Sequence, residues 1–307
     1  MTEKRPMVIL TGPTAVGKTA LSIELAKKIN GSIISADSMQ VYRHMDIGSA
    51  KVMPEEMDGI RHYLIDEFEP DEEFNVHVFK EKTLEYMDKI YEAGKIPIIV
   101  GGTGFYIQSV LYDIQFNDEE IDSAYRKELE NIAKEKGNDY LHNMLKEVDE
   151  ESALNIHKNN LKRVIRALEF YKNTGEKIST HNFVYFVLND KRELLYERIN
   201  KRVDIMFDKG LVNEVKNLLN MGYTKDLVSM NGIGYKEVVD YINGKYSLDE
   251  TKEIIKRETR HFAKRQLTWF RREKDVTMVN YFDYDSIDDT LKYMINTLRE
   301  KDIIKND

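Results

Sequence analysis

Eight residues near the start of the chain have the types and spacing of a phosphate-binding loop. The run Gly12-Pro13-Thr14-Ala15-Val16-Gly17-Lys18-Thr19 fits the pattern G-x-x-x-x-G-K-[ST]. In such a loop the backbone N–H groups and the following helix N-terminus face an anion, and the lysine adds a positive charge. The threonine hydroxyl is the usual protein ligand for a magnesium ion, which makes Thr19 the expected metal ligand. The pattern predicts a site for a phosphate compound but does not say which one.

Asp37 is the acidic residue expected closest to this loop. It follows the strand expected at Ser32–Ser35, so it should lie at the carboxyl edge of the sheet, where ligands bind in such folds. A carboxylate in that place can act as a catalytic base. The alternative is that Asp37 caps a helix within residues 36–40, which is a common use of aspartate.

A glycine-rich segment follows another expected strand. The run Ile96–Val100 leads into Gly101-Gly102-Thr103-Gly104, whereas a nucleotide hydrolase usually ends this strand in an aspartate that helps hold magnesium. Glycines allow the backbone to approach a ligand closely. The segment therefore favours a diphosphate group that leaves over a nucleotide whose terminal phosphate is attacked.

The elements that must position these residues alternate between strands and helices. Short apolar runs predict strands at Val8–Leu10, Ser32–Ser35, Ile96–Val100 and Val184–Leu188. Helical patterns are expected at Ala20–Ala26, Val76–Glu92, Lys191–Asp208 and Ser247–Arg272, and residues 66–73 are expected to form a solvated loop. Such alternation predicts an α/β fold whose parallel sheet is covered on both faces.

The strand signal disappears between about residues 113 and 180, where the sequence is charged and helix-patterned. We therefore expect a P-loop NTPase-like α/β core made of residues 1–113 and 184–307. An all-helical domain at 114–183 would be inserted into it, and the C-terminal region would be helical.

Composition limits the class of protein. The 307 residues are 41% hydrophobic and 33% charged, enough for a substantial core in a soluble chain. The absence of cysteine excludes disulfides, cysteine zinc sites and thiol nucleophiles, and the seven histidines show no H-E-x-x-H spacing. With no apolar run of membrane-spanning length and no secretory leader, we expect a cytoplasmic monomer without a membrane partner.

The charge is unevenly distributed. The net charge is −8, yet residues 251–272 carry eight basic side chains and only two acidic ones. In the expected insertion, Lys162, Arg163 and Arg166 lie opposite an apolar helix face formed by Leu161, Val164, Ile165 and Leu168. Basic faces of this kind can hold a polyanion, although a solvated outer face is the commoner reason for them.

Several motifs in the same order resemble the tRNA dimethylallyltransferase family, also called tRNA isopentenyltransferases, over almost the whole chain. Besides residues 12–19, the matching segments are Ser35-Ala36-Asp37-Ser38-Met39-Gln40-Val41-Tyr42-Arg43, Asp46-Ile47-Gly48-Ser49-Ala50-Lys51, Gly101-Gly102-Thr103-Gly104-Phe105-Tyr106, Lys162-Arg163-Val164-Ile165-Arg166-Ala167-Leu168-Glu169, Arg202-Val203-Asp204, Ile233-Gly234-Tyr235-Lys236-Glu237, and Thr259-Arg260 with Ala263-Lys264-Arg265-Gln266 and Thr268-Trp269-Phe270-Arg271. One small departure is Ser49, where the family usually has threonine.

The resemblance implies transfer of a dimethylallyl group from dimethylallyl diphosphate to N6 of the adenosine on the 3′ side of a tRNA anticodon. Asp37 would remove the proton from the amine, while Lys18, the loop amides, Mg²⁺ on Thr19 and Arg202 would stabilise the leaving diphosphate. Thr103 would hold the adenine or the diphosphate. The target base would be turned out of its stack to reach the pocket.

The resemblance also implies a set of residues that contact tRNA. Trp269 and Phe270 would either stack on a base or anchor their helix in the core. The expected tRNA-binding residues are Asp37, Ser38, Met39, Gln40, Thr103, Arg126, Lys162, Arg163, Arg166, Arg260 and Gln266.

Three other readings share parts of this pattern. An isopentenyltransferase acting on free adenine nucleotides would keep the phosphate loop and Asp37 but would not need the basic helices. A small-molecule kinase would use ATP, and the absence of an aspartate after Val100 counts against it. A non-catalytic nucleic-acid-binding module would not need the phosphate loop.

Overall fold

The apolar runs expected as strands pair into one parallel sheet. The computed structural model describes residues 4–112, 123–174, 179 and 181–305. Within them the sheet has the order β3-β2-β4-β1-β5-β6. The four expected strands are present as β1 (Pro6–Thr11), β2 (Gly31–Ala36), β4 (Ile96–Gly101) and β5 (Asn182–Asn189). Met7 to Leu10 are fully buried, because a parallel sheet is covered on both faces.

Two strands were not expected. β3 (His62–Tyr63) pairs with β2 at one edge of the sheet, and β6 (Val276–Asn280) pairs with β5 at the other. β3 is too short to give a periodic signal. β6 lies in the region expected to be helical, although its run of β-branched residues is typical of a strand. The α/β fold class is confirmed, and the C-terminal region contributes a strand as well as helices.

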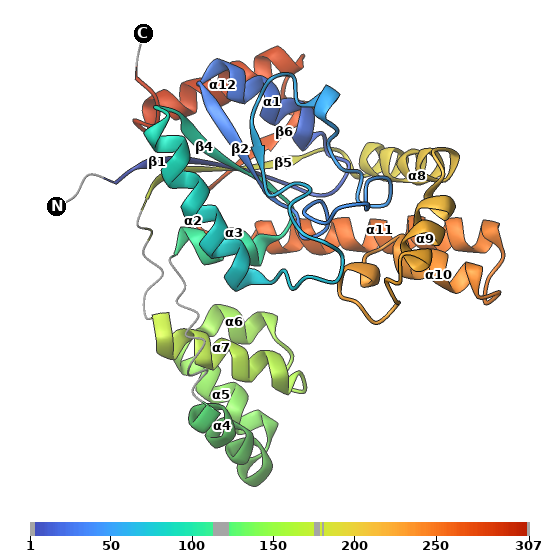
Figure 1. The fold of residues 1–307 in the computed structure, drawn as a ribbon. Coiled ribbons are helices and arrows are strands. Elements are labelled where there is room, and N and C mark those ends of the chain that lie inside the picture. The colour runs from blue at the N-terminus through green and yellow to red at the C-terminus, as the bar shows by residue number, and fades with distance from the viewer. Residues whose placement is uncertain (1–3, 113–122, 175–178, 180, 306–307) are drawn as a thin grey trace. The chain divides into compact units, whose positions relative to one another are not determined.

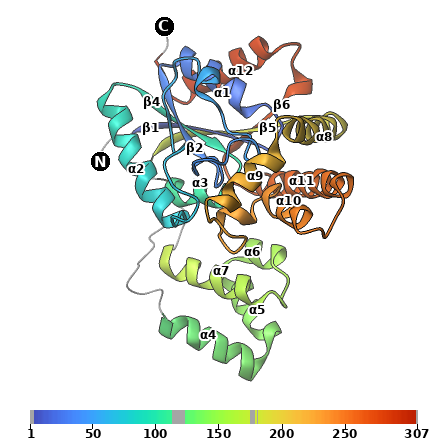
Figure 2. The same cartoon turned by 45° about the vertical axis from the view of Figure 1, so that its right-hand side comes forward.

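Helices cover both faces of the sheet. α1 (Lys18–Lys28) and α12 (Ile287–Glu300) lie on one face, and α2 (Val76–Glu92) and α3 (Gly104–Leu111) lie on the other (Figures 1 and 2). The bounds of α2 agree with the prediction, because Asn75 caps the helix by accepting hydrogen bonds from the N–H groups of the second and third helical residues at 2.9 and 3.0 Å.

A group of helices continues beyond the sheet. It consists of α8 (Arg192–Asp208), α9 (Leu211–Asn220), α10 (Tyr235–Ile242) and α11 (Leu248–Phe270), with α8 packed against α11. Ser247 caps α11 by accepting a hydrogen bond from Glu250 N. Short 3₁₀ helices lie at Pro54–Glu56, Ser229–Asn231 and Tyr281–Asp283. No helix in the described part of the chain is both long enough and apolar enough to cross a membrane.

Residues 111–180 form a second compact unit, separate from the unit made of residues 1–110 and 181–307. Its helices are α4 (Ser123–Lys136), α5 (Asn138–Val148), α6 (Glu150–Asn155) and α7 (Leu161–Thr174). Their apolar faces enclose a small core of leucine, valine, isoleucine and alanine side chains. The expected start of the insertion near residue 114 lies outside the described residues, and its expected end at 183 overlaps the start of β5.

Candidate active site

The phosphate-binding loop lies between β1 and α1, as the sequence predicts. The backbone conformation of this loop requires glycine at two positions, 12 and 17. Gly12 has a φ of +146°, and a Cβ atom there would lie 2.6 Å from the carbonyl oxygen of Leu188. Gly17 has a φ of +99° at the N-cap of α1, a conformation that L side chains rarely adopt. The loop can therefore turn its amides toward an anion at the start of α1.

Lys18 is folded back onto this loop. Its Nζ donates hydrogen bonds to the carbonyl oxygens of Gly12 at 3.0 Å and Pro13 at 2.9 Å. Burial lowers the pKa of Lys18 to about 8, while the nearby charge of Asp37 opposes the shift and that of Arg202 adds to it. An anion bound in the loop would replace the two carbonyl oxygens as the partner of the ammonium group.

Arg202 comes from α8, far away in sequence. Burial lowers its pKa, and the charges of Asp37 and Glu56 oppose that shift. The fold thus brings Lys18, Arg202 and Asp37 close enough to influence one another, as the predicted site requires. Neighbouring Val203 is buried and helps to fix the helix that carries the guanidinium group.

Asp37 makes hydrogen bonds of the kind that a capping residue makes, but no helix follows it. One carboxylate oxygen, Oδ1, accepts hydrogen bonds from the N–H groups of Met39 at 2.8 Å and Gln40 at 3.3 Å. These bonds close a turn after β2 and do not cap a helix. The prediction of a helix cap is therefore wrong, although the side chain does accept backbone N–H groups as a cap would. The turn fixes the carboxylate at the carboxyl edge of the sheet.

The glycine-rich segment after β4 passes very close to its neighbours. A Cβ atom on Gly101 would lie 2.2 Å from the carbonyl oxygen of Ala36, and one on Gly102 would lie 2.1 Å from Nε2 of Gln266. Thr103 donates its N–H to the Ala36 carbonyl at 3.3 Å, and its own carbonyl accepts the first hydrogen bonds of α3. The segment brings Thr103 to the end of β2, immediately before Asp37.

Gln266 joins the phosphate loop to this glycine-rich segment. Its Oε1 accepts the N–H of Thr14 at 2.9 Å, and its Nε2 donates to the carbonyl of Gly102 at 3.1 Å. The residue is only 6% exposed. It was expected as a tRNA contact, but in the structure its amide holds α11 against two loops of the site.

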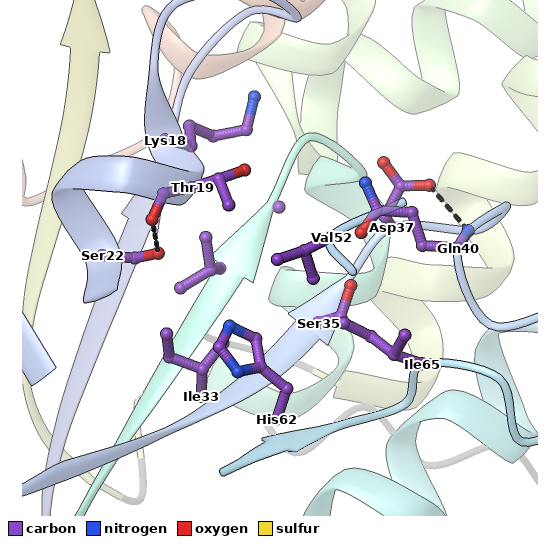
Figure 3. Close-up of a pocket in the computed structure, with 12 residues that line it drawn as sticks. Lys18, Thr19, Ser22, Ile33, Ser35, Asp37, Gln40, Val52, His62 and Ile65 are labelled. Carbon is purple, nitrogen blue, oxygen red and sulfur yellow. Dashed lines mark hydrogen bonds between the residues drawn. The ribbon is translucent and has the colours of Figure 1, made fainter. Parts of the chain in front are cut away.

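A pocket lies at the carboxyl edge of the sheet beside these residues (Figure 3). Lys18, Thr19 and Asp37 line it with charged or hydroxyl groups. Apolar side chains line it too, and these were not found from the sequence because no motif marks them. The apolar lining residues are Ile33, Val52, Ile65 and Val100, and the remaining polar ones are Ser22, Ser35, Gln40 and His62. The pocket therefore suits a ligand that has both an anionic and a small apolar part.

The remaining residues of the expected tRNA set have varied surroundings. Ser38 and Met39 are half-buried in the turn after Asp37, and a Cβ atom on Gly232 would touch the terminal methyl group of Met39. In the second unit, Arg126 makes two 2.8 Å hydrogen bonds to the carboxylate of Glu169. The side chains of Lys162, Arg163 and Arg166 are exposed on α7, opposite buried Val164, Ile165 and Leu168.

The basic residues of α11 divide into paired and exposed ones. Lys256 binds Asp204 at 2.9 Å and Glu253 at 3.2 Å, and Arg260 donates to Asn200 Oδ1 at 2.5 Å. The exposed basic side chains at and just beyond the end of the helix are Lys264, Arg265, Arg271 and Arg272. The positive charge of Lys256 is therefore explained by its pairing with nearby carboxylates.

The two adjacent aromatic residues of α11 differ. Phe270 is fully buried and anchors the helix, whereas Trp269 is 39% exposed. A Cβ atom on Gly104 would lie 2.1 Å from the indole nitrogen of Trp269, so the indole packs against the glycine-rich segment. Part of the Trp269 ring surface is therefore exposed.

The described residues contain no group of three or more His, Asp or Glu side chains placed to hold a metal ion. The acid that directly follows β5, Asp190, is buried and already accepts hydrogen bonds from Lys191 N at 2.7 Å and Arg198 at 2.5 Å. Thr19, in contrast, lines the pocket. A magnesium ion keeps several waters and is often held by one or two protein ligands and the substrate's phosphates, so the donor set fits an ion that arrives with a diphosphate.

Comparison with known proteins gives a consistent result. A family model described as IPP transferase matches residues 40–273. A tRNA dimethylallyltransferase from Lachnoclostridium phytofermentans is 59% identical, over 98% of this chain and 100% of its own. Another, from Acetivibrio thermocellus, is 53% identical, over 95% of this chain and 97% of its own.

Solved structures agree with these sequences. The full-length tRNA isopentenylpyrophosphate transferase of Bacillus halodurans superposes with a TM-score of 0.75 at 45% identity, covering 97% of this chain and 98% of that one. A eukaryotic dimethylallyltransferase acting on tRNA gives a TM-score of 0.72 at 27% identity, covering 96% of this chain and 80% of that one.

Proposed function

The chain belongs to the IPP transferase family, and from that membership we propose that it transfers a dimethylallyl group from dimethylallyl diphosphate to tRNA. The acceptor atom is N6 of the adenosine next to the 3′ side of the anticodon. The observation that carries the proposal is the pocket at the sheet edge, where Lys18 and Thr19 adjoin apolar Ile33 and Val52. A molecule with an anionic head and a five-carbon apolar chain could contact the polar and the apolar lining residues at the same time.

The diphosphate is bound by the loop amides and by cationic side chains. Lys18 leaves its carbonyl partners for the phosphate oxygens, and Arg202 adds a second positive charge. As the C1–O bond breaks, the electron pair goes to the diphosphate, and these groups stabilise the charge that develops on it. Mg²⁺, held by Thr19 and the phosphates, would supply further positive charge to the leaving group.

Asp37 receives the proton. The exocyclic amine of adenosine attacks C1 of the dimethylallyl group, forms the N6–C1 bond and loses a proton to the carboxylate. Because Oδ1 already accepts two backbone N–H groups, we assign the proton to Oδ2. Thr103, which is hydrogen-bonded to the end of β2 just before Asp37, would orient the adenine.

The acceptor must reach this pocket as a base turned out of the anticodon loop. Trp269 supplies a partly exposed aromatic surface beside Gly104, and the exposed cations at the end of α11 and on α7 supply contacts for phosphates. A tRNA acceptor implies a cytoplasmic location, which we propose on that ground alone.

A comparison of acceptors tests the proposal. The protein is incubated with labelled dimethylallyl diphosphate and Mg²⁺, and with either unmodified tRNA or adenosine monophosphate. We expect label to enter tRNA and not the free nucleotide. Transfer to the nucleotide alone would identify a free-nucleotide isopentenyltransferase. A further reaction is supplied with ATP, and ATP consumption without transfer in it would identify a kinase or ATPase.

A further inference from the structure

A carboxylate and a phenol from α9 and α10 hold four consecutive backbone amides of residues 46–49. Glu214 accepts the N–H groups of Asp46, Ile47 and Gly48 at 3.0, 2.7 and 3.0 Å. The hydroxyl of Tyr235 accepts the fourth N–H, from Ser49, at 3.1 Å, and donates to Glu214 at 2.9 Å. We call Glu214 and Tyr235 the amide clamp.

The amide clamp fits its loop closely. Tyr235 is fully buried, and a Cβ atom on Gly48 would lie 2.5 Å from its ring carbon Cζ. Hydrogen bonds to a charged acceptor are stronger than those between neutral groups. Burial and the neighbouring Glu214 raise the pKa of Tyr235, so its hydroxyl remains a donor at ordinary pH. The loop backbone is therefore fixed at four successive positions.

The clamped loop leads directly to the proposed base. Gln40 donates from its side-chain amide to the carbonyl of Ala50 at 3.3 Å, just beyond the clamped segment. The backbone N–H of the same residue donates to Oδ1 of Asp37 at 3.3 Å. One residue thus connects the loop to the turn that fixes the carboxylate.

A buried lysine forms a second connection. Lys51 Nζ donates to Asp46 Oδ1 at 2.6 Å, to the carbonyl of Tyr42 at 2.7 Å and to Asp66. Its side chain is fully buried. The next residue, Val52, lines the pocket. The loop held by the amide clamp therefore borders both the turn that carries Asp37 and the apolar wall.

We propose that Glu214 and Tyr235 are positioning residues for Asp37, acting through the 46–51 loop and Gln40. This inference rests on the proposed function, because it assigns the clamp to the step in which Asp37 takes the proton. It also gives a purpose to the Asp46–Lys51 and Ile233–Glu237 motifs, whose residues lie outside the phosphate site itself. The alternative is that the clamp only stabilises the fold.

Tyr235→Phe is the first test, since it removes the hydroxyl but keeps the ring. Because small misplacements remote from the chemistry can cost about 100-fold in rate, we expect kcat to fall by up to about that factor. Donor affinity should change much less than kcat, because Glu214 and Tyr235 bond the amides of residues 46–49 and the diphosphate is bound by the loop at residues 12–19. The matched control is Tyr91→Phe, which removes a hydroxyl bonded to the Pro6 carbonyl at 2.9 Å elsewhere in the same unit.

A double mutant separates positioning from general stability. If Tyr235 acts through Asp37, Tyr235→Phe should have little further effect on the residual rate of an Asp37→Ala enzyme, since effects on one shared mechanism are not additive. A full, independent loss in the Asp37→Ala background would overturn the proposal. An unchanged kcat in the Tyr235→Phe single mutant would overturn it too.

Hydrogen exchange of residues 46–49 tests the clamp without relying on activity. Tyr235→Phe and Glu214→Gln should both speed exchange of these amides, while Glu250→Gln, which alters a carboxylate bonded to Ser247 N on α11, should not. Fast exchange in the wild type would refute the clamp itself. If exchange responds as expected but the wild type prenylates no tRNA, the proposed function fails and the claim that the clamp positions a base fails with it. If the Glu214→Gln variant does not fold, the exchange rates in the Tyr235→Phe variant still test the clamp.

Discussion

At the residue scale, the central feature is the carboxylate of Asp37, to whose two oxygens we assign different roles. Asp37 Oδ1 is occupied by two backbone N–H groups, which fix the side chain in one orientation. The carboxylate is thereby set beside the cations of Lys18 and Arg202. A base held by the backbone needs little reorganisation when the amine arrives, which is the physical value of the turn after β2.

Two substitutions separate the turn from the base. Asp37→Asn keeps an oxygen that can accept the turn hydrogen bonds but cannot take a proton, whereas Asp37→Ala removes both functions. We expect each to slow the single-turnover prenylation step by about 10²–10⁴-fold, the usual range for general acid–base catalysis. Binding of tRNA should weaken less in Asp37→Asn than in Asp37→Ala. Near-wild-type turnover by Asp37→Asn would exclude Asp37 as the base.

The lowered pKa of Lys18 predicts a pH dependence for donor binding. The ammonium form binds diphosphate, so binding favours the protonated state. Affinity of the free enzyme should therefore be constant below the pKa of about 8 and fall as the pH rises through it. Titrating the donor between pH 6.5 and 9.5, roughly, spans that value. Lys18→Arg, which keeps its charge throughout, should lose this dependence, and a pH dependence unchanged in that variant would assign it to another group.

At the element scale, the site depends on loops that the sheet brings together. β2 and β4 are adjacent and parallel, so Asp37 and Thr103, which follow them, meet at the same edge. Gln266 then joins α11 to both the phosphate loop and the glycine-rich segment. Gln266 thus fixes the C-terminal part of α11 next to the candidate site, and the exposed cations of the helix lie near the same end.

The basic faces predict a salt dependence that differs between helices. Replacing Lys162, Arg163 and Arg166 on α7 by alanine should weaken tRNA binding and reduce the log–log salt slope by roughly 0.7–0.9 for each phosphate that is no longer neutralised. Donor affinity should hardly change. Lys256→Ala is the matched control, because this cation is already paired with two carboxylates. Equal slopes for wild type and the triple mutant would mean that the α7 face does not neutralise tRNA phosphates.

Local sequence signals predicted the elements with strong periodicity. The phosphate loop, four strands and the bounds of α2 were predicted from glycine spacing, apolar runs and a helical pattern. β3 and β6 were missed because each is short and gains its stability from pairing at a sheet edge. Propensity within one segment cannot show such pairing.

The candidate site was predictable only where motifs mark it. The fold brings Lys18, Asp37 and Arg202 close to one another. The apolar wall of Val52 and Ile65 belongs to loops without a periodic pattern. The amide clamp joins residues more than 160 positions apart, so no local pattern contains it. Likewise, the role of Gln266 depends on two backbone partners that only the fold reveals.

At the scale of the whole molecule, an acidic chain must bind an acidic partner. The net charge is −8, so the attraction for tRNA has to come from local surfaces and not from the overall charge. Each of the two units carries one such surface, on α7 in residues 111–180 and at the end of α11 in the core. The groups proposed to be catalytic all belong to the core, so the reaction and part of the tRNA binding are assigned to different units.

The most direct test of the central claim is the mass of the modified nucleoside. Unmodified tRNA is incubated with the protein, dimethylallyl diphosphate and Mg²⁺, digested with a ribonuclease of known specificity, and mapped by mass spectrometry. We predict that the adenosine on the 3′ side of the anticodon gains one C₅H₈ group, and that tRNA treated with Asp37→Asn shows far less of this product at the same time point. An unmodified adenosine at that position, or a gain on another nucleotide, would contradict the account.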